Sequence, residues 1–148
     1  MSDCKFCTLL SSGPLAASLS NLVVETDRAV VAVNRKPVAP GHLTIILKRH
    51  HPRTSALQDD DLGGVVRLLG QLSRLLEERF QPGRVVFLGD GKRSAHVHWH
   101  LIPEPAGVTL DLGAAVADLN LASRPATLTE PEVQQLVGAL RQAMGKAP

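Results

Sequence analysis

"SAHVHWHLIPEP", residues 94–105, places a histidine at every second position of an otherwise largely apolar run. Successive side chains of a β-strand point to opposite faces of the sheet, so His96, His98 and His100 share one face. The valine, tryptophan and leucine that alternate with them share the other face and can pack on a hydrophobic core. Neighbouring histidines in such a row lie about 6.5–7 Å apart, a distance that suits a phosphate group and its ester neighbours.

The histidine row favours nucleophilic and acid–base chemistry. Neutral imidazole is a nucleophile and imidazolium is a proton donor, and both forms are accessible near neutral pH. Two other interpretations stay open. One is a polar strand face on which the histidines are incidental. The other is a zinc or iron site, because His-x-His on a strand presents two imidazoles to a metal. The carboxylate that a cupin-type site would add is displaced by one position, at Glu104.

The composition indicates one globular domain. The chain of 148 residues is 44% hydrophobic and carries a formal net charge of +2, which predicts a single domain over residues 1–148. The sequence has no long basic stripe with interleaved aromatic residues, which argues against a nucleic-acid-binding surface. No apolar run reaches the roughly 18 residues of a membrane-spanning helix, and the N-terminus lacks a secretion signal. We therefore expect a cytoplasmic protein with no membrane or nucleic-acid partner, in which Cys4 and Cys7 are reduced.

Hydrophobic periodicity predicts the order of helices and strands. Short β-branched and aliphatic runs predict strands at residues 22–25, 29–33, 42–48, 84–88 and in the histidine stretch. Apolar residues at three- and four-residue spacings predict a long helix from the aspartates at 59–61 to Phe80. A terminal helix is expected at about residues 130–144, with Thr129 or Thr127 as its cap. Hairpin-like connections favour an α+β fold on a mainly antiparallel sheet of about five strands.

The histidine stretch resembles a known family signature. His96 to Ile102 is similar to the His-φ-His-φ-His-φ-φ motif of the histidine triad (HIT) family, where φ is an apolar residue. Residues 31–50 resemble the family's strand–loop–strand, and especially that of its fragile histidine triad branch of dinucleoside polyphosphate hydrolases. "CKFC" at residues 4–7 and "RVVFLGDG" before the motif also fit. The resemblance covers about residues 4–103 and implies a HIT-like fold.

The resemblance implies a nucleotide hydrolase or transferase. Such an enzyme acts at the α-phosphorus of dinucleoside polyphosphates or related nucleotide derivatives, with an adenine nucleotide as the expected substrate. His98 matches the family's nucleophile, which forms a covalent nucleotidyl-imidazole that water resolves. His100 matches the histidine that contacts phosphate oxygens. His96 matches the one that supports leaving-group chemistry or binds zinc. No catalytic metal is required.

Five further residues are expected to bind the substrate or to shape its site: Asn34, His42, Lys92, Arg93 and Ser94. Asn34 matches a ribose-contacting position of the family, and His42 matches a position that supports the triad. Many family members carry Gln-Ser or Gln-Thr in the loop before the motif, and this chain does not. We expect Ser94 to replace that pair in part, and Lys92 and Arg93 to supply positive charge.

A second departure leaves the leaving group open. Glu104 stands where the family often has an arginine, and a carboxylate there would oppose a polyanionic substrate. A nucleoside phosphoramidase therefore stays open as an alternative, as does a nucleotide-binding regulatory module with weak turnover. The resemblance also implies a homodimer that pairs through the sheet edge and the long helix.

The cysteine pair indicates a metal site only in combination with the resemblance. Two cysteines with a two-residue spacer are compatible with zinc, redox chemistry or coincidence. Some HIT proteins bind a structural zinc through such a pair, a histidine after the second long strand, and the first triad histidine. In this chain the set is Cys4, Cys7, His50 and His96, with His51 as an alternative third ligand. Such a closed Cys₂His₂ set is structural.

Overall fold

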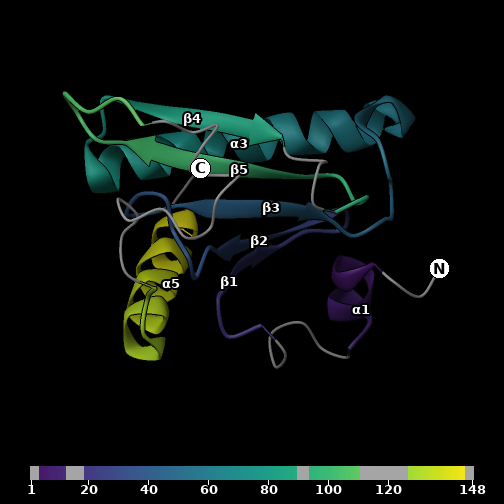
Figure 1. Ribbon diagram of the computed structural model, residues 1–148, viewed down its shortest axis with the longest axis horizontal. Helices are drawn as coiled ribbons and strands as arrows, with labels where there is room; N and C mark the ends of the chain where they lie inside the picture. The colour runs from purple at the N-terminus through teal and green to yellow at the C-terminus, as the bar shows by residue number, and fades with distance from the viewer. Residues whose placement is uncertain (1–3, 13–18, 90–93, 111–126, 146–148) are drawn as a thin grey trace.

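The computed structural model describes residues 4–12, 19–89, 94–110 and 127–145. Figure 1 shows the elements in their chain order. They are α1 (Lys5–Ser11), β1 (Leu22–Glu25), β2 (Ala29–Val33), β3 (Leu43–Leu47), the 3₁₀ turn η1 (Thr54–Ala56), α3 (Asp59–Phe80), β4 (Arg84–Gly89), β5 (His98–Glu104) and α5 (Glu130–Met144). None of the helices in these ranges is long and apolar enough to cross a membrane.

The strands form one five-stranded sheet in the order β1-β2-β3-β5-β4. Every neighbouring pair is antiparallel. The predicted α+β class and antiparallel sheet are therefore confirmed. The long helix α3 follows β3 and precedes β4, so the chain crosses from the centre of the sheet to its far edge before β5 fills the gap.

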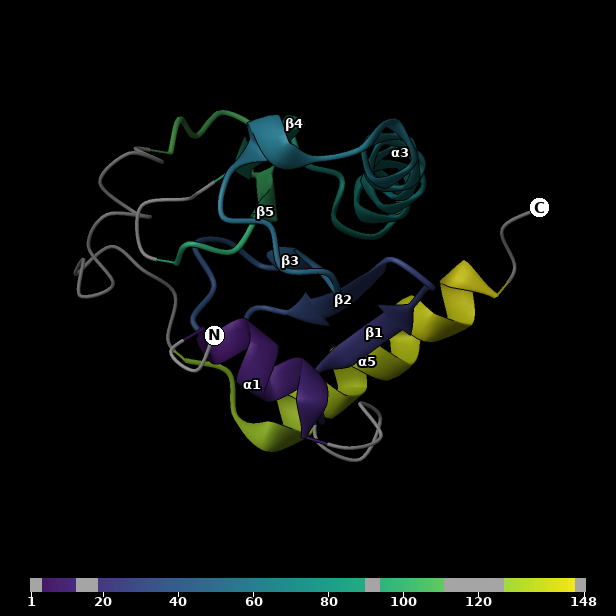
Figure 2. The same ribbon diagram turned by 90° about the vertical axis from the view of Figure 1, so that its right-hand side faces the viewer.

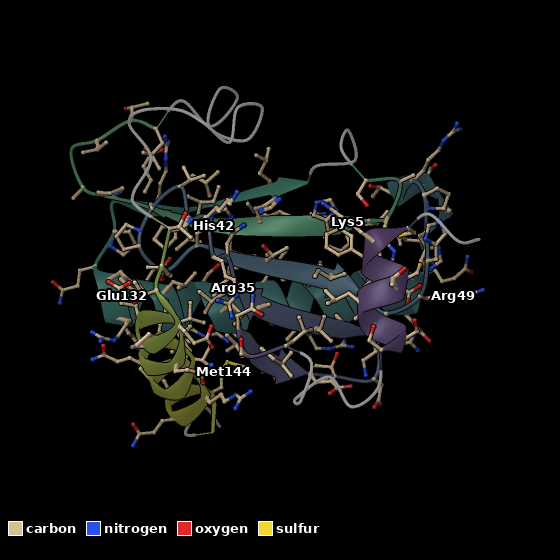
Figure 3. The ribbon with its side chains drawn as sticks, turned by 60° about the horizontal axis from the view of Figure 1, so that its bottom comes forward. Lys5, Arg35, His42, Arg49, Glu132 and Met144 are labelled. Atoms are coloured by element: carbon tan, nitrogen blue, oxygen red, sulfur yellow. The ribbon has the colours of Figure 1, made fainter. Side chains whose placement is uncertain are left out.

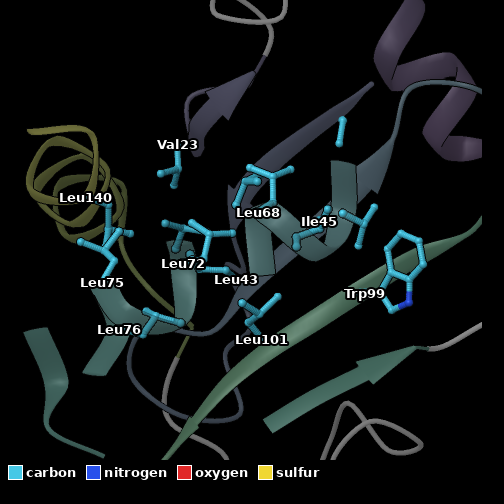
Figure 4. Close-up of a cluster of buried hydrophobic side chains, with 14 of the residues drawn as sticks. Val23, Leu43, Ile45, Leu68, Leu72, Leu75, Leu76, Trp99, Leu101 and Leu140 are labelled. Atoms are coloured by element: carbon cyan, nitrogen blue, oxygen red, sulfur yellow. The ribbon is translucent and has the colours of Figure 1, made fainter. Parts of the chain in front are cut away.

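Helices cover both faces of the sheet, and Figure 2 shows α3 and α1 on opposite sides of it. The larger core lies under α3 and α5. There the apolar side chains of β5, including Trp99 and Leu101, pack with buried leucines of α3 such as Leu72 (Figure 4). A fully buried leucine contributes roughly 1.5–3 kcal/mol by its removal from water. The predicted assignment of the two faces of the histidine strand is thus confirmed on its apolar side.

The smaller core lies under α1, on the face that carries the histidines. Its buried members on the sheet include Val30 and Ile46, and Phe6, Leu9 and Leu10 of α1 pack against them. Because these contacts are all long-range, they explain why a helix of only seven residues forms here.

The long helix matches its prediction in length and in its ends. Three aspartates occupy its first turn, where carboxylates interact favourably with the helix dipole. It ends at Gln81, whose φ of 47° is left-handed and allows its N–H to bond the Glu77 carbonyl. Two of the residues that the apolar pattern includes, Leu62 and Val66, are 39% and 64% exposed. The apolar surface of α3 is therefore wider than the core beneath it.

The terminal helix α5 lies beside the edge strand β1 (Figure 2). Thr129 and Glu132 form a capping box at its start, which confirms Thr129 as the cap. The Arg141 guanidinium donates a hydrogen bond of 2.7 Å to the backbone carbonyl of Leu22 on β1. The β1 edge of the sheet is thus covered by a helix.

Candidate functional site

The candidate site lies at the centre of the sheet, on the face opposite α3. The register of β3 and β5 pairs Ile46 with His98 and Thr44 with His100. His96 comes just before β5, in a bend. The three histidines therefore follow one another along a single line on this face, as their alternation predicts.

The histidine face is more enclosed than the alternation indicates. His96 is fully buried and His98 is only 6% exposed, and the alternation of residues 96–101 alone does not indicate that another element covers this face. The cover comes from α1. The Phe6 ring centroid lies 4.9 Å from that of His98 and 5.5 Å from that of His96. Phe6 is thus a site residue that sequence analysis missed, although it stands between the two cysteines of "CKFC".

Hydrogen bonding fixes the tautomer of His98. Its Nδ1 lies 2.7 Å from the backbone carbonyl oxygen of His96. A carbonyl oxygen only accepts, so Nδ1 carries the proton and donates it. In the neutral ring the lone pair is then on Nε2. This is the nitrogen that a nucleophilic imidazole uses.

A second chain of hydrogen bonds fixes the tautomer of His100. The Val38 N–H donates to Nδ1 of His42 over 3.1 Å, so the proton of a neutral His42 ring is on Nε2. That Nε2 lies 2.9 Å from Nδ1 of His100 and donates to it. The proton of a neutral His100 ring is therefore on its Nε2. The buried His42 (labelled in Figure 3) thus contacts the triad directly through His100, and its role as a support of the triad stays a prediction.

The two triad rings on β5 are complementary. The ring centroids of His98 and His100 are 5.3 Å apart, with the rings nearly perpendicular at 76°. One ring presents a lone pair and the other an N–H group. This combination can attack an electrophilic phosphorus and hydrogen-bond one of its oxygens.

Asn34 begins the loop between β2 and β3, beside the histidine face. Its side-chain amide donates to the Thr44 hydroxyl over 3.4 Å, and its Oδ1 accepts the Lys36 N–H over 2.9 Å. Thr44 is directly opposite His100 in the register, so one side chain, that of Thr44, lies between Asn34 and the triad strand. Thr44 is 8% exposed and is a second member of the site that sequence analysis did not single out.

The residues expected to supply phosphate contacts are only partly accounted for. Lys92 and Arg93 lie outside the described residues. The Ser94 side chain contributes to the lowered pKa of the Cys4 thiol, so Ser94 lies at the cysteine end of the histidine line. Its role as a phosphate contact stays a prediction.

The Glu104 carboxylate, which was expected to repel a polyanionic substrate, is paired with an arginine in the structure. It is 5% exposed, and its Oε1 lies 2.8 Å from the Arg84 guanidinium on β4. Its Oε2 accepts the Leu110 N–H over 3.4 Å. Since Arg84 faces Glu104 across the β4–β5 pair, the negative charge is compensated locally. The carboxylate instead links the end of β5 to the chain that follows it.

Four potential metal ligands meet beneath α1. The ligand atoms of Cys4, Cys7, His50 and His96 all lie within 4.8 Å of one another. Nδ1 of His96 is 3.3 Å from Cys4 Sγ, 3.6 Å from Cys7 Sγ and 3.3 Å from Nδ1 of His50. Bond lengths in a tetrahedral zinc site put ligand atoms about 3.3–3.8 Å apart. The group therefore fits zinc in both donor type and spacing.

The protonation of this group also suits a metal. Nε2 of His96 donates to the Leu47 carbonyl over 2.7 Å, so the lone pair on Nδ1 points to the cysteines. Burial lowers the pKa of His96, which favours the neutral ring. Burial raises the pKa of the Cys4 thiol, but hydrogen bonds from Cys7, Phe6 and Ser94 outweigh it and leave that pKa below its usual value. Burial and the neighbouring Cys4 raise the pKa of Cys7.

His51 does not join the four-ligand group. Its ring turns to the start of α3, where Nε2 lies 3.3 Å from Asp61 Oδ2 without good hydrogen-bond geometry. Both side chains are buried, and Arg28 donates to Asp61 Oδ1 over 3.0 Å. Of the two alternatives for the third ligand, the structure thus brings His50 to the cysteines and turns His51 toward Asp61.

One surface hollow lies away from the histidines. A cavity of about 280 Å³ is found between the β1–β2 turn and α3, on the opposite side of the sheet. Arg28, Gly64 and Arg67 are among its lining residues. The histidine line and this hollow are thus separate features of the structure.

Comparison with curated proteins gives relatives that are named as nucleotide hydrolases. The chain is 32% identical over 96 residues to a bis(5'-adenosyl)-triphosphatase of Dictyostelium discoideum, which covers 62% of this chain and 64% of that protein. The match thus spans less than two thirds of that relative's length. It is 27% identical over 130 residues to an adenosine 5'-monophosphoramidase of Candida albicans, covering 80% and 83% of the two chains.

Comparison with solved structures confirms the fold. A Zn-bound histidine triad family protein from Mycobacterium smegmatis superposes with a TM-score of 0.73 at 17% identity. The superposition covers 97% of this chain and 94% of that chain.

A family model assigns the domain directly. Residues 17–107 match the HIT domain, and these make up more than half of the chain. The matched range contains the triad, Asn34, His42 and His50, whereas the two cysteines and α5 lie outside it. Together with the line of histidines on β5, the match identifies the chain as a member of the histidine triad (HIT) family.

Proposed function

We propose that the protein is a nucleotide hydrolase that acts at the α-phosphorus of dinucleoside polyphosphates or related nucleotide derivatives. The observation that carries this proposal is the hydrogen bond from His98 Nδ1 to the His96 carbonyl. It holds the His98 ring in the tautomer whose Nε2 is the nucleophile. The names of the relatives, a triphosphatase and a phosphoramidase, support a nucleotide substrate.

The proposed reaction has two steps. His98 Nε2 attacks the α-phosphorus, a P–N bond forms, and the bond from phosphorus to the leaving group breaks. Water then attacks the same phosphorus and loses a proton to the solvent, the P–N bond breaks, and a nucleoside monophosphate is released while Nε2 recovers its lone pair. His100 Nε2–H is the hydrogen-bond donor for a phosphate oxygen whose charge increases in each transition state.

His42 and Asn34 have supporting roles in this proposal. His42 holds His100 in the donor tautomer through the 2.9 Å contact between their rings. The Asn34 amide binds the ribose hydroxyls, and a weak 3.4 Å bond to Thr44 leaves it able to change partner at little cost. The adenine base is expected from the substrates in the relatives' names.

We also propose that Cys4, Cys7, His50 and His96 hold a structural zinc ion. A zinc ion there would supply a cross-link between α1 with the residue before it, the segment after β3, and the bend just before β5. The closed Cys₂His₂ donor set and the ligand spacing support this assignment. The M. smegmatis structure of the same fold is named as Zn-bound.

We further propose a homodimer that pairs through β4 and α3. β4 is an edge strand, and the other edge strand, β1, lies beside α5. An uncovered edge is a template for pairing with another chain. Phe87 on β4 is 43% exposed and stacks on Trp99 with ring centroids 6.0 Å apart. Val66 on α3, at 64% exposed, adds apolar surface that a second copy would bury.

A phosphoramidase is the second candidate activity. The observation that favours it is the match to the C. albicans monophosphoramidase, which covers more of this chain than the triphosphatase match. Both activities use the same attack by His98 and differ in whether the leaving group is a phosphate oxygen or an amine. The kcat/KM values for diadenosine triphosphate, diadenosine tetraphosphate and adenosine phosphoramidate rank the candidates directly.

Mass spectrometry of samples that are quenched and kept at alkaline pH, where the P–N bond of a nucleotidyl-histidine survives, separates an enzyme from a nucleotide-binding regulatory module. Turnover of either substrate class with an adduct on His98 supports the proposal. Tight nucleotide binding without turnover and without adduct would show instead that the site is a binding module.

A further inference from the structure

The loop of residues 34–42 contains two residues of the candidate site, Asn34 and His42, and a backbone hydrogen bond joins its two ends. The Asn34 N–H donates to the His42 carbonyl over 2.9 Å, and the His42 N–H donates to the Ala39 carbonyl over 3.1 Å. Inside the loop, Val38 binds the His42 ring and Lys36 binds the Asn34 side chain. A shift of this loop therefore moves Asn34 and the partner of His100 together.

The start of the C-terminal helix contacts this loop at Arg35. The Arg35 carbonyl accepts the Leu128 N–H over 3.1 Å. Its guanidinium forms an ion pair of 2.8 Å with Glu130 and hydrogen-bonds the Ser20 hydroxyl. Figure 3 shows Arg35 and His42 at the end of the sheet where α5 begins, whereas Lys5 on α1 lies at the other end. Backbone and side chain of Arg35 thus both bind outside the loop.

Glu130 is itself held in place. Gln134, one turn along α5, donates to Glu130 over 2.9 Å and to the Ser20 carbonyl over 2.7 Å. The hydrogen bond from Arg35 lowers the pKa of Glu130 to about 2, with further contributions from Gln134 and Ser20. The carboxylate therefore keeps its charge at every pH at which an enzyme of this kind is assayed. The Arg35 and Glu130 side chains are 39% and 53% exposed, so the pair is also sensitive to salt.

The helix that supplies Glu130 is anchored independently of the loop. Val133, Val137 and Leu140 of α5 are buried in the larger core. The residues that match the HIT domain end at 107, so α5 is outside that match. Helix α5 lies outside the matched residues and is anchored in the larger core, and it contacts the loop that carries Asn34.

We propose that α5 is part of the scaffold of the nucleotide site, with Arg35 and Glu130 as positioning residues for Asn34 and His42. The 2.8 Å ion pair and the Leu128–Arg35 backbone bond hold the loop at the distance at which Asn34 meets Thr44 and His42 meets His100. The consequence for substrate rests on the proposed nucleotide activity. The effect on the position of the loop is independent of that activity, because it is measured in the protein without ligand.

Two glutamates on the first turn of α5 provide a matched test. Glu130→Gln removes the charge that pairs with Arg35. Glu132→Gln changes the other exposed glutamate and retains a residue that suits the capping box. Amide hydrogen exchange in the ligand-free protein measures the N–H groups of Asn34, Lys36, Val38 and His42. We expect faster exchange in Glu130→Gln by about two- to fivefold, the effect of losing a partly exposed ion pair, and no change in Glu132→Gln.

Kinetics provide the second readout. We expect KM for the nucleotide to rise by about two- to fivefold in Glu130→Gln with a smaller change in kcat. The double variant Arg35→Glu with Glu130→Arg should restore both readouts toward wild type, whereas Arg35→Glu alone should not. A wild-type protein that neither binds nor hydrolyses nucleotides would contradict the proposed function. Hydrogen exchange would still test whether the Arg35–Glu130 pair holds the loop in place.

Three results would overturn the proposal. The first is unchanged exchange in Glu130→Gln. The second is an equal effect of Glu132→Gln, which would mean that general stability of α5 is responsible. The third is a lower KM for a polyphosphate substrate in Glu130→Gln, which would make Arg35 a phosphate ligand that Glu130 restrains.

Discussion

Nδ1 of His98 donates a hydrogen bond of 2.7 Å to the backbone carbonyl of His96. The ring of His96 faces the two cysteines and His50, with its Nδ1 3.3 Å from Cys4 Sγ. One residue therefore belongs to the proposed zinc site through its side chain and orients the proposed nucleophile through its backbone. The proposed zinc ligand His96 and the proposed nucleophile His98 are separated by one residue, Val97, and we expect disturbance of one to reach the other.

The adjacent histidines at 50 and 51 provide a test of the zinc site. We expect the purified protein to contain about one zinc ion per chain, as the closed four-ligand set implies. His50→Ala should lose most of this zinc, because it removes a ligand. His51→Ala should keep it, because its ring faces Asp61. Elemental analysis gives the stoichiometry. Metal-free wild-type protein that was never exposed to chelator, or equal zinc loss in both variants, would contradict the assignment.

The Phe6 ring is expected to matter for chemistry as well as stability. Phe6→Ala removes the ring that lies 4.9 Å from His98, whereas Leu10→Ala removes a side chain of the same helix that packs on the smaller core. Both variants should lower the free energy of unfolding by about 1–2 kcal/mol, less than a fully buried side chain costs because each is only partly buried. Only Phe6→Ala should also lower kcat. Urea denaturation and steady-state kinetics measure the two effects, and an equal loss of kcat in both variants would argue against a specific role.

The buried carboxylate of Asp61 predicts a loss of stability in acid. Burial raises its pKa, but the hydrogen bond and charge of Arg28, with contributions from Gln58 and His51, hold that pKa below its ordinary value of 3.8. A group whose pKa is lowered on folding stabilises the fold above its unfolded pKa, and this stabilisation is lost below about pH 4. Asp61→Asn should therefore cost about 1–3 kcal/mol near neutral pH and progressively less in acid.

Asp60 is the control for this experiment. It pairs with the same Arg28 over 2.9 Å, but its side chain is 79% exposed. Asp60→Asn should change the free energy of unfolding by less than about 1 kcal/mol at any pH. Denaturation curves for the two variants from pH 3 to 8 give the comparison, and parallel curves would mean that burial of Asp61 is unimportant.

The sequence is sufficient to predict the strands of the sheet and the two faces of β5, because the strands follow from local β-branched and aliphatic runs and the faces follow from local alternation. The Val97–Leu101 face packs on α3 as expected, and the long helix has its predicted ends. The burial of His96 was not predictable in the same way. It depends on α1, a helix of seven residues that is stabilised by Leu9 and Leu10 packing on strands far along the chain. A helix of this length has no reliable local signal.

The same reason explains the other differences. The position of Glu104 opposite Arg84 follows from the β4–β5 register, which hydrophobic pattern alone does not specify. The choice between His50 and His51 as metal ligand depends on how the chain turns after β3. Cys4 and Cys7 were identified from their spacing, but their approach to His96 required the resemblance or the structure.

The proposed dimer predicts the effect of two surface substitutions. We expect wild-type protein to have twice the chain mass of 15.8 kDa in light scattering at micromolar concentration. Val66→Glu and Phe87→Glu should shift it to the monomer, because each places a charge in the apolar surface that a second copy would bury. Gln71→Glu, on the side of α3 that faces the β1–β2 turn, is the control and should remain dimeric. A monomeric wild type would contradict the proposal.

The most direct test of the central claim is the identity of the residue that carries a nucleotidyl group during turnover. Wild-type protein is mixed with diadenosine tetraphosphate or adenosine phosphoramidate, quenched within the first turnover, and digested for mass spectrometry. We expect an adenylyl group on the peptide that contains His98, no adduct in His98→Asn, and nucleotide binding that persists in that variant. Turnover should fall by far more than tenfold, a barrier increase above about 1.4 kcal/mol. An adduct on another residue, or His98→Asn with turnover within tenfold of wild type, would contradict His98 as the nucleophile.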